Sequence, residues 1–123
     1  IYSAARLLEI VAGEAVAVSE IFAGFPHAVA TPEIRVPVDE ARKFALVDRL
    51  VSSGVLDRGD VTTIDGLRVD YPDGWGLVRA SNTAPALTLR FEADTAGAVH
   101  EIVDQFKTAL RELDPSVDFT IDL

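Results

Sequence analysis

Four short β-rich segments with brief connections constrain the fold of this chain more than any other feature. The segments are Val61 to Ile64, Leu67 to Tyr71, Gly76 to Ala80 and Ala86 to Ala93. Asp65-Gly66, Pro72-Asp73-Gly74 and a loop after Arg79 connect them. Because connections this short join neighbouring antiparallel strands, the pattern predicts an antiparallel meander.

Two amphipathic segments flank the meander and predict the helices that cover it. The first follows Asp39, a helix-capping residue, and ends at Gly54; the second follows Thr95 and ends before Pro115. Their apolar stripes are Phe44, Val47, Leu50 and Val51 in the first, and Val99, Ile102, Val103, Phe106, Leu110 and Leu113 in the second. A last strand over residues 117–121 is expected to return along the sheet. The sequence therefore predicts an α+β fold, with an antiparallel four- to five-stranded sheet covered by two helices.

The N-terminal quarter is expected to lie outside the domain that contains the meander. Ser3 is expected to cap a short helix that ends at Gly13. Residues 14–37 contain three prolines and predict irregular chain with one edge strand near residues 33–36. We therefore expect residues 1–29 to be the tail of a preceding domain and a linker, and residues 30–123 to be a separate domain.

Composition narrows the class of protein. The 123 residues begin with Ile1 and include no methionine, so we expect a piece of a longer polypeptide, with a processed mature protein as the alternative. Eleven basic and 20 acidic residues give a net charge of -9, which disfavours nucleic acid and anionic membranes as partners. The absence of cysteine excludes disulfides and thiolate metal sites, and no run approaches the ~20 apolar residues of a membrane span. We expect a cytoplasmic location.

The loop between the last two predicted strands has the most informative chemistry. It is the heptad Arg79-Ala80-Ser81-Asn82-Thr83-Ala84-Pro85. A guanidinium offers a planar fork of donors to phosphate oxygens, and hydroxyl, amide and backbone N–H groups add neutral donors. Pro85 stiffens the loop, which reduces the entropy lost on binding a ligand. The residues alone leave two interpretations open: a phosphate-binding loop, or an ordinary turn in which the polar side chains only satisfy the backbone.

The motif around this loop is long and unusual in composition. It is Gly74-Trp75-Gly76-Leu77-Val78-Arg79-Ala80-Ser81-Asn82-Thr83-Ala84-Pro85, followed by Leu87 and by Leu89-Arg90-Phe91-Glu92-Ala93. It resembles the C-terminal domain (domain 4) of the α-D-phosphohexomutases, most closely the bacterial phosphomannomutase/phosphoglucomutase branch. The resemblance extends over roughly residues 30–123 and implies the TATA-box-binding-protein-like fold of that domain. Residues before it resemble the tail of the family's third domain.

The resemblance also implies a function and a site. Arg79, Ser81, Asn82 and Thr83 match the family's substrate phosphate-binding loop, which holds the sugar phosphate that is not being transferred, and Ala84 departs from the Glu or Thr common there. The implied enzyme is a phosphoglucomutase/phosphomannomutase, an isomerase that interconverts hexose 1-phosphate and hexose 6-phosphate through a phosphoserine and Mg²⁺. Its partners would be glucose 1-phosphate, mannose 1-phosphate, their 6-phosphates and the remaining domains of the parent enzyme.

The family's phosphoserine segment and acidic magnesium loop have no match in this sequence. We therefore expect no catalytic residue here, Mg²⁺ bound outside the fragment, and no activity from the fragment alone. A non-catalytic α+β regulatory or small-ligand-binding module is the alternative.

Several residues outside the loop are further candidates for a site. Arg90 is a further candidate for the anion site, and Arg68 is a weaker one. The competing interpretation is that each is a solvated arginine, which is ordinary on a strand of alternating polarity. Trp75 is expected to pack rather than to bind sugar. His27, His100 and the acidic segment Asp57-Arg58-Gly59-Asp60 lack metal-ligand spacing, so no metal site is expected.

Overall fold

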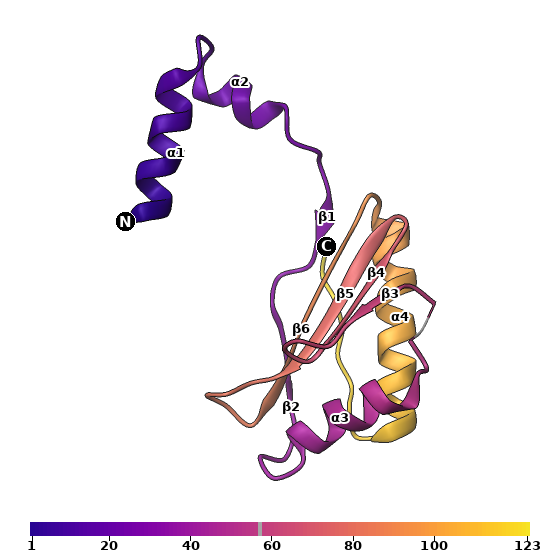
Figure 1. The fold of residues 1–123 in the computed structure, drawn as a ribbon. Coiled ribbons are helices and arrows are strands. Elements are labelled where there is room, and N and C mark those ends of the chain that lie inside the picture. Colours follow the sequence, from indigo (N-terminus) through magenta and orange to yellow (C-terminus); the bar gives the residue numbers. More distant parts are fainter. Residues whose placement is uncertain (57) are drawn as a thin grey trace.

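The structure is a computed structural model that describes residues 1–56 and 58–123. Its helices are α1 (Tyr2–Gly13), α2 (Val18–Ala23), α3 (Lys43–Ser53) and α4 (Ala96–Leu113). Its strands are β1 (Val29–Ala30), β2 (Ile34–Pro37), β3 (Asp60–Thr62), β4 (Leu67–Tyr71), β5 (Gly74–Ala80) and β6 (Ala86–Ala93). Figure 1 shows α3 and α4 on one side of the sheet, which confirms the α+β class.

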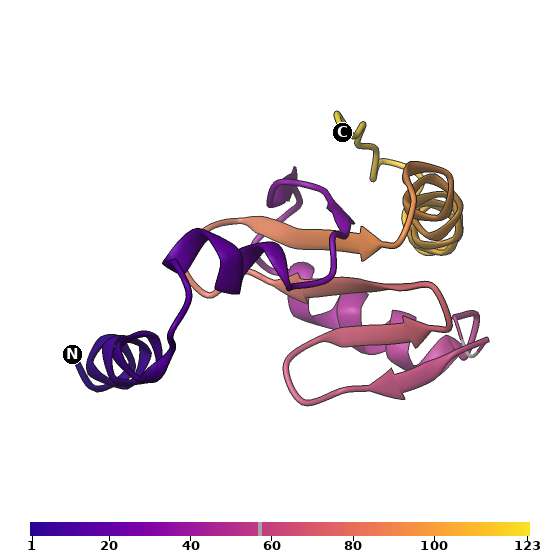
Figure 2. The same ribbon diagram turned by 90° about the horizontal axis from the view of Figure 1, so that it is seen from above.

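The predicted meander is present and forms most of the sheet. Neighbouring strands are antiparallel in the order β1-β6-β5-β4-β3, and β2 also pairs with β6. Figure 2 shows β3 to β6 side by side. The described residues thus form six strands rather than four or five, because β1 and β2 pair one after the other with the same edge of β6. Thr31 bridges them to β6: its N–H donates to the Phe91 carbonyl (2.9 Å) and its Oγ1 accepts from Phe91 N–H (3.1 Å).

The core lies between the sheet and the two helices. Alternate strand residues point into it, among them Val69, Val78, Leu89 and Phe91, all fully buried. From α4, Phe106 packs edge-on against Phe91 with ring centroids 5.3 Å apart. The intervening strand residues face the opposite side of the sheet, which no helix of the described residues covers. The chain's candidate functional arginines lie on this open face.

The predicted helix boundaries are largely confirmed. Thr95 caps α4 by accepting a hydrogen bond from Ala98 N–H (3.2 Å), and Gly54 ends α3 in the left-handed conformation (φ 64°). The prediction of Asp39 as the N-cap of α3 is wrong, because the cap position is Arg42. Asp39 instead forms the turn before the helix, where its carboxylate accepts from Ala41 N–H (2.8 Å).

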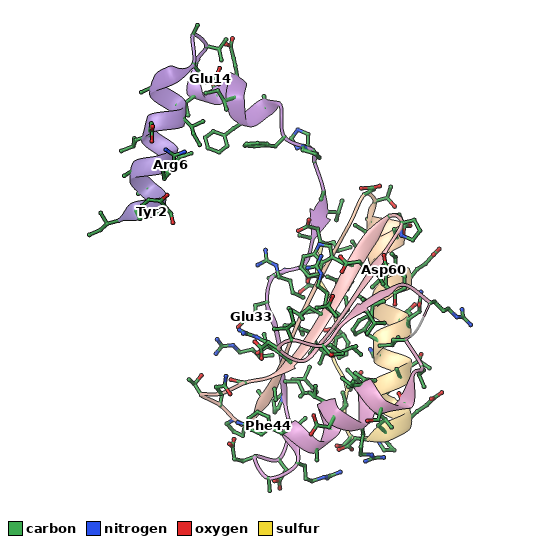
Figure 3. All side chains as sticks on the ribbon, viewed as in Figure 1. Tyr2, Arg6, Glu14, Glu33, Phe44 and Asp60 are labelled. Carbon is green, nitrogen blue, oxygen red and sulfur yellow. The ribbon has the colours of Figure 1, made fainter. Side chains whose placement is uncertain are left out.

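The N-terminal segment stands apart from the sheet (Figures 1 and 2). Helix α1 ends at Gly13 as predicted, but its cap position is Ile1 rather than Ser3. Side chains such as Tyr2 and Arg6 project from α1 without burial (Figure 3). Helix α2 lies within residues 14–37, which were predicted to be irregular. Glu20 explains its start, because its carboxylate accepts a hydrogen bond from Ala17 N–H (3.3 Å) at the first turn.

The predicted C-terminal strand is wrong. Residues 117–121 are irregular chain, although the alternation of Val117, Phe119 and Ile121 is typical of a strand. The outer edge of β6 is already occupied by β1 and β2, so a returning strand has no partner there. The segment packs its apolar side chains into the core instead. Phe119 stacks on Phe91 with the two ring centroids 6.3 Å apart.

Candidate functional site

The loop of residues 81–85 joins β5 to β6 and projects from the end of the sheet (Figure 1). Backbone bonds close it: Ser81 N–H donates to the Ala86 carbonyl (2.9 Å), and Ala86 N–H donates to the Ala84 carbonyl (2.8 Å). Inside the loop, Ser81 Oγ accepts from Thr83 N–H (3.3 Å). The hydroxyl therefore helps to shape the turn, as the ordinary-turn interpretation expects.

Two contacts from other elements hold the back of the loop. Val38 N–H, just after β2, donates to the Pro85 carbonyl (3.0 Å). The Nζ of Lys43, at the start of α3, donates to the Ala84 carbonyl (3.0 Å). Figure 3 shows the neighbouring Phe44 at the end of the sheet from which the loop projects. The loop is thus tied to β2 and α3 as well as to its own two strands.

Arg79 lies at the base of the loop on the open face of the sheet. Its backbone is in register with Thr88 of β6, and its side chain is 44% exposed. The guanidinium donates from Nη1 to Asp65 Oδ2 at 3.2 Å. Asp65 belongs to the tight turn between β3 and β4, where Gly66 (φ 90°) lies directly against the Arg79 backbone. This turn positions the carboxylate that holds the arginine.

The remaining predicted site residues lie on the loop itself. Asn82 and Thr83 are exposed and Ser81 is half-buried. The turn therefore brings Arg79, Ser81, Asn82 and Thr83 together within one short segment at one end of the sheet. Five guanidinium N–H donors, two hydroxyls, a side-chain amide and loop N–H groups are a donor set suited to an oxyanion such as phosphate.

The other two arginine candidates differ in their surroundings. Arg90 is exposed on the open face of β6, two residues beyond Thr88 and opposite Leu77. Arg90 is a diagonal cross-strand neighbour of Arg79. Residues at such positions in an antiparallel pair lie roughly 7–8 Å apart. Arg68 instead bonds to Asp70 (Nε–Oδ2 2.9 Å) and its guanidinium lies 4.1 Å over the Trp75 ring.

The electrostatics of Arg68 agree with a structural role. Its hydrogen bonds to Asp70 raise the pKa of the guanidinium and lower the pKa of the Asp70 carboxyl. Trp75 packs against this arginine, as expected for a structural aromatic residue. Arg90 therefore remains a candidate for the anion site, whereas Arg68 is engaged elsewhere.

Two residues at the site were missed as site residues in the sequence. Asp65 was assigned only to a turn, and nothing in the local sequence shows that the turn reaches Arg79. Lys43 was overlooked, although it stands at helical spacing from the buried Val47 and Leu50. That spacing is the signal that could have indicated a lysine pointing into the protein.

A divalent cation at this site would need several converging oxygen or nitrogen ligands. Among the described residues, no group of three His, Asp or Glu side chains is placed to bind one. Asp57, one of the acidic residues weighed in the sequence, lies outside the described residues. Across the described part of the chain, no helix combines the length and the apolar character that crossing a membrane requires.

Comparison with known proteins connects this geometry to a family. Residues 33–109 match the family described as phosphoglucomutase/phosphomannomutase, C-terminal domain. The chain is 49% identical over 117 residues to a Pseudomonas aeruginosa protein named phosphomannomutase/phosphoglucomutase, covering 95% of this chain and 25% of the relative. A Neisseria meningitidis phosphoglucomutase is 42% identical over 112 residues, covering 89% of this chain and 24% of the relative.

A solved structure agrees with the sequence relatives. The crystal structure of a phosphoglucomutase/phosphomannomutase family protein from Burkholderia thailandensis matches with a TM-score of 0.80 and 42% identity, over 99% of this chain and 25% of that one. The chain therefore spans about a quarter of the length of the relatives it matches. The predicted resemblance is confirmed: the chain belongs to the phosphoglucomutase/phosphomannomutase family, and it corresponds to the family's C-terminal domain.

Proposed function

We propose that this chain is the substrate-phosphate-binding domain of a longer phosphoglucomutase/phosphomannomutase that interconverts hexose 1-phosphates and hexose 6-phosphates. The observation that carries the proposal is the gathering of Arg79, Ser81, Asn82 and Thr83 on one anchored turn. In this proposal residues 30–123 form the phosphate-binding domain, and residues 1–29 are the tail and linker of the preceding domain. The names of the relatives support the reaction class.

The loop would bind the phosphate at the end of the sugar that is not reacting. Arg79 presents a fork of five N–H donors, and its bond to Asp65 involves the single atom Nη1. A phosphate can therefore accept bonds from the rest of the fork while Asp65 keeps the side chain in place. Holding the distant phosphate positions the opposite end of the sugar for phosphoryl transfer, which lowers the entropic part of the barrier.

Closure of the domain over substrate is part of the proposal. We propose a hinge in the segment that precedes Pro37, and the pairing of this segment with the sheet supports a position at its start. From Val29 onward the chain pairs with β6, and Thr31 bonds to Phe91 at both its N–H and its hydroxyl. A rigid-body movement that preserves the sheet must therefore occur before Val29. Such a movement would carry the loop toward the substrate and exclude water.

The chemistry itself would take place outside this chain. In the proposal, the phosphoserine and the Mg²⁺ that assists transfer belong to other domains of the parent enzyme. We accordingly propose that the chain alone is inactive, that its ligands are the glucose and mannose phosphates, and that the parent enzyme is cytoplasmic.

Replacing Arg79 by alanine in the full-length enzyme tests the proposal. Losing charge-assisted hydrogen bonds of about 1.5–3 kcal/mol should lower kcat/KM for glucose 1-phosphate by about tenfold to hundredfold. The matched control is Arg111→Ala on α4, because Arg111 has a similar exposed fraction (48% against 44%) and also bonds to one aspartate. Its kcat/KM should stay within about twofold of wild type.

Equal kinetics for Arg79→Ala and wild type would refute the assignment. Amide chemical shifts of the chain, titrated with glucose 1-phosphate and mannose 1-phosphate, give an independent measurement. Shifts concentrated at residues 79–83 are expected. A response confined to another part of the molecule would instead support the alternative of a regulatory or small-ligand-binding module.

A further inference from the structure

Lys43 is a buried lysine that the proposed function does not yet use. Its side chain is 1% exposed, whereas lysine is almost never fully buried unless it is paired. Its Nζ lies 2.7 Å from Glu40 Oε1 and 3.0 Å from the Ala84 carbonyl oxygen. The lysine therefore connects the first turn of α3 to the backbone of the phosphate-binding loop.

The two partners of Lys43 are not equivalent. The Glu40 side chain is 66% exposed, so water can stabilise its charge without the lysine. The Ala84 carbonyl belongs to the loop, one residue after Thr83, and its direction fixes the peptide planes around it. The ammonium group has three N–H donors, so it can hold both partners at once. The contact with Ala84 is the one that bears on the loop.

The contacts of Lys43 and Val38 add supports from other elements to the hydrogen bonds within the loop. Residues 82 and 83 are exposed, and the carbonyls of Ala84 and Pro85 are the points at which α3 and the segment after β2 hold the turn. A loop fixed before binding loses less conformational entropy when it closes on a ligand.

We propose that Lys43 is a positioning residue for the phosphate-binding loop, which it holds through the Ala84 carbonyl in the shape that receives the phosphate of a hexose phosphate. The inference rests on the proposed function. It assigns binding affinity to a residue that does not touch the ligand. It also predicts that the bond to Ala84, rather than the ion pair with Glu40, carries the effect.

The test compares Lys43→Met with Glu40→Gln in the full-length enzyme. Methionine is an unbranched side chain one atom shorter than lysine; it suits a buried site but has no N–H donor. Glu40→Gln keeps the lysine and removes its charged partner. By calorimetric titration with glucose 1-phosphate, Lys43→Met should bind about tenfold more weakly, and Glu40→Gln should stay within about twofold of wild type. Lys43→Arg, which keeps a charged donor, should recover part of the lost affinity.

Hydrogen exchange of the ligand-free protein gives a second readout. The amides of Ser81 and Ala86, which close the loop, should exchange about tenfold faster in Lys43→Met, while core amides of β5 and α4 keep their wild-type rates. If Lys43→Met does not fold, Lys43→Gln serves in both measurements, because it shortens the reach to Ala84 and keeps a polar group.

The outcomes separate this inference from the proposed function. Unchanged affinity in Lys43→Met would overturn it, whether or not the loop amides exchange faster. An equal loss of affinity in Lys43→Met and Glu40→Gln would also overturn it, since the ion pair would then carry the effect. A full-length wild-type enzyme that does not bind glucose 1-phosphate would refute the proposed function, and unchanged loop exchange in Lys43→Met would still refute the anchoring of the loop.

Discussion

Gly66→Ala is the substitution for which the structure predicts the clearest loss of stability. Gly66 has a φ of 90°, a conformation that costs an L-amino acid about 1–2 kcal/mol. A Cβ at this position would lie 2.3 Å from the Val78 carbonyl oxygen and 2.8 Å from the Arg79 Cα. Both obstacles are backbone atoms of β5, so neither can move away as a flexible side chain could.

The magnitude follows from three contributions. The overlap should cost about 1–3 kcal/mol, as overpacking does in a well-packed site. Alanine also restricts the unfolded chain, which returns about 0.4–1 kcal/mol. Together with the conformational cost, the free energy of unfolding should fall by about 3 kcal/mol. Because the obstacle includes Arg79, binding of glucose 1-phosphate should weaken as well.

Urea unfolding of the chain measures this loss. Trp75 is the only tryptophan and lies on β5, the strand that the new methyl group would displace, so its fluorescence reports unfolding. Gly97→Ala is the matched control, since its Cβ would meet only Thr95 Oγ1 at 3.9 Å in the first turn of α4. The control should be as stable as wild type or slightly more stable. Wild-type stability of Gly66→Ala, or an equal loss in Gly97→Ala, would refute the reasoning.

Two further predictions concern the core and the acid stability of the fold. Phe106 is fully buried against Phe91, so Phe106→Ala should lower the free energy of unfolding by about 3–5 kcal/mol in urea titrations, whereas Phe22→Ala on the exposed α2 should change it little. The second prediction depends on Asp114, whose pKa is lowered, chiefly by the hydrogen bond from the Ser116 hydroxyl, then by that from Ser116 N–H and by the charge of Arg42. A depressed carboxyl pKa stabilises the fold above the ordinary value of 3.8, and this stabilisation is lost as the pH falls through the lower pKa of the folded state. Thermal unfolding between about pH 5 and pH 2 should therefore show a smaller acid-induced loss of stability for Asp114→Asn than for wild type. An equal acid-induced loss in the two proteins would contradict this assignment.

The sequence predicted the parts of the fold that depend on local patterns. The turn at Asp65-Gly66, the cap at Thr95 and the left-handed Gly54 each depend on the conformational preferences of one or two residues, so the meander and both covering helices could be predicted. The C-terminal strand failed because alternation does not show whether a sheet edge is unoccupied. Strand β1 is only two residues long and depends on pairing with β6 rather than on its own pattern.

The candidate site also combines residues that a local pattern predicts with residues that only long-range packing brings to it. Arg79, Ser81, Asn82 and Thr83 are close in sequence, so a single turn brings them together. Asp65 and Lys43 reach the loop only through the packing of other elements, and such contacts leave little trace in a local pattern. Lys43 is 41 residues away from the carbonyl to which it donates.

The margins of the sheet have a consequence for the behaviour of the molecule in concentrated solution. The outermost strands are short: β3 has three residues, β1 has two, and β2 has four and ends at Pro37, which has no N–H group. Short or proline-containing borders give a neighbouring molecule few backbone groups to pair with. We therefore expect the sheet to resist pairing edge to edge with a second molecule, the step from which fibrils grow.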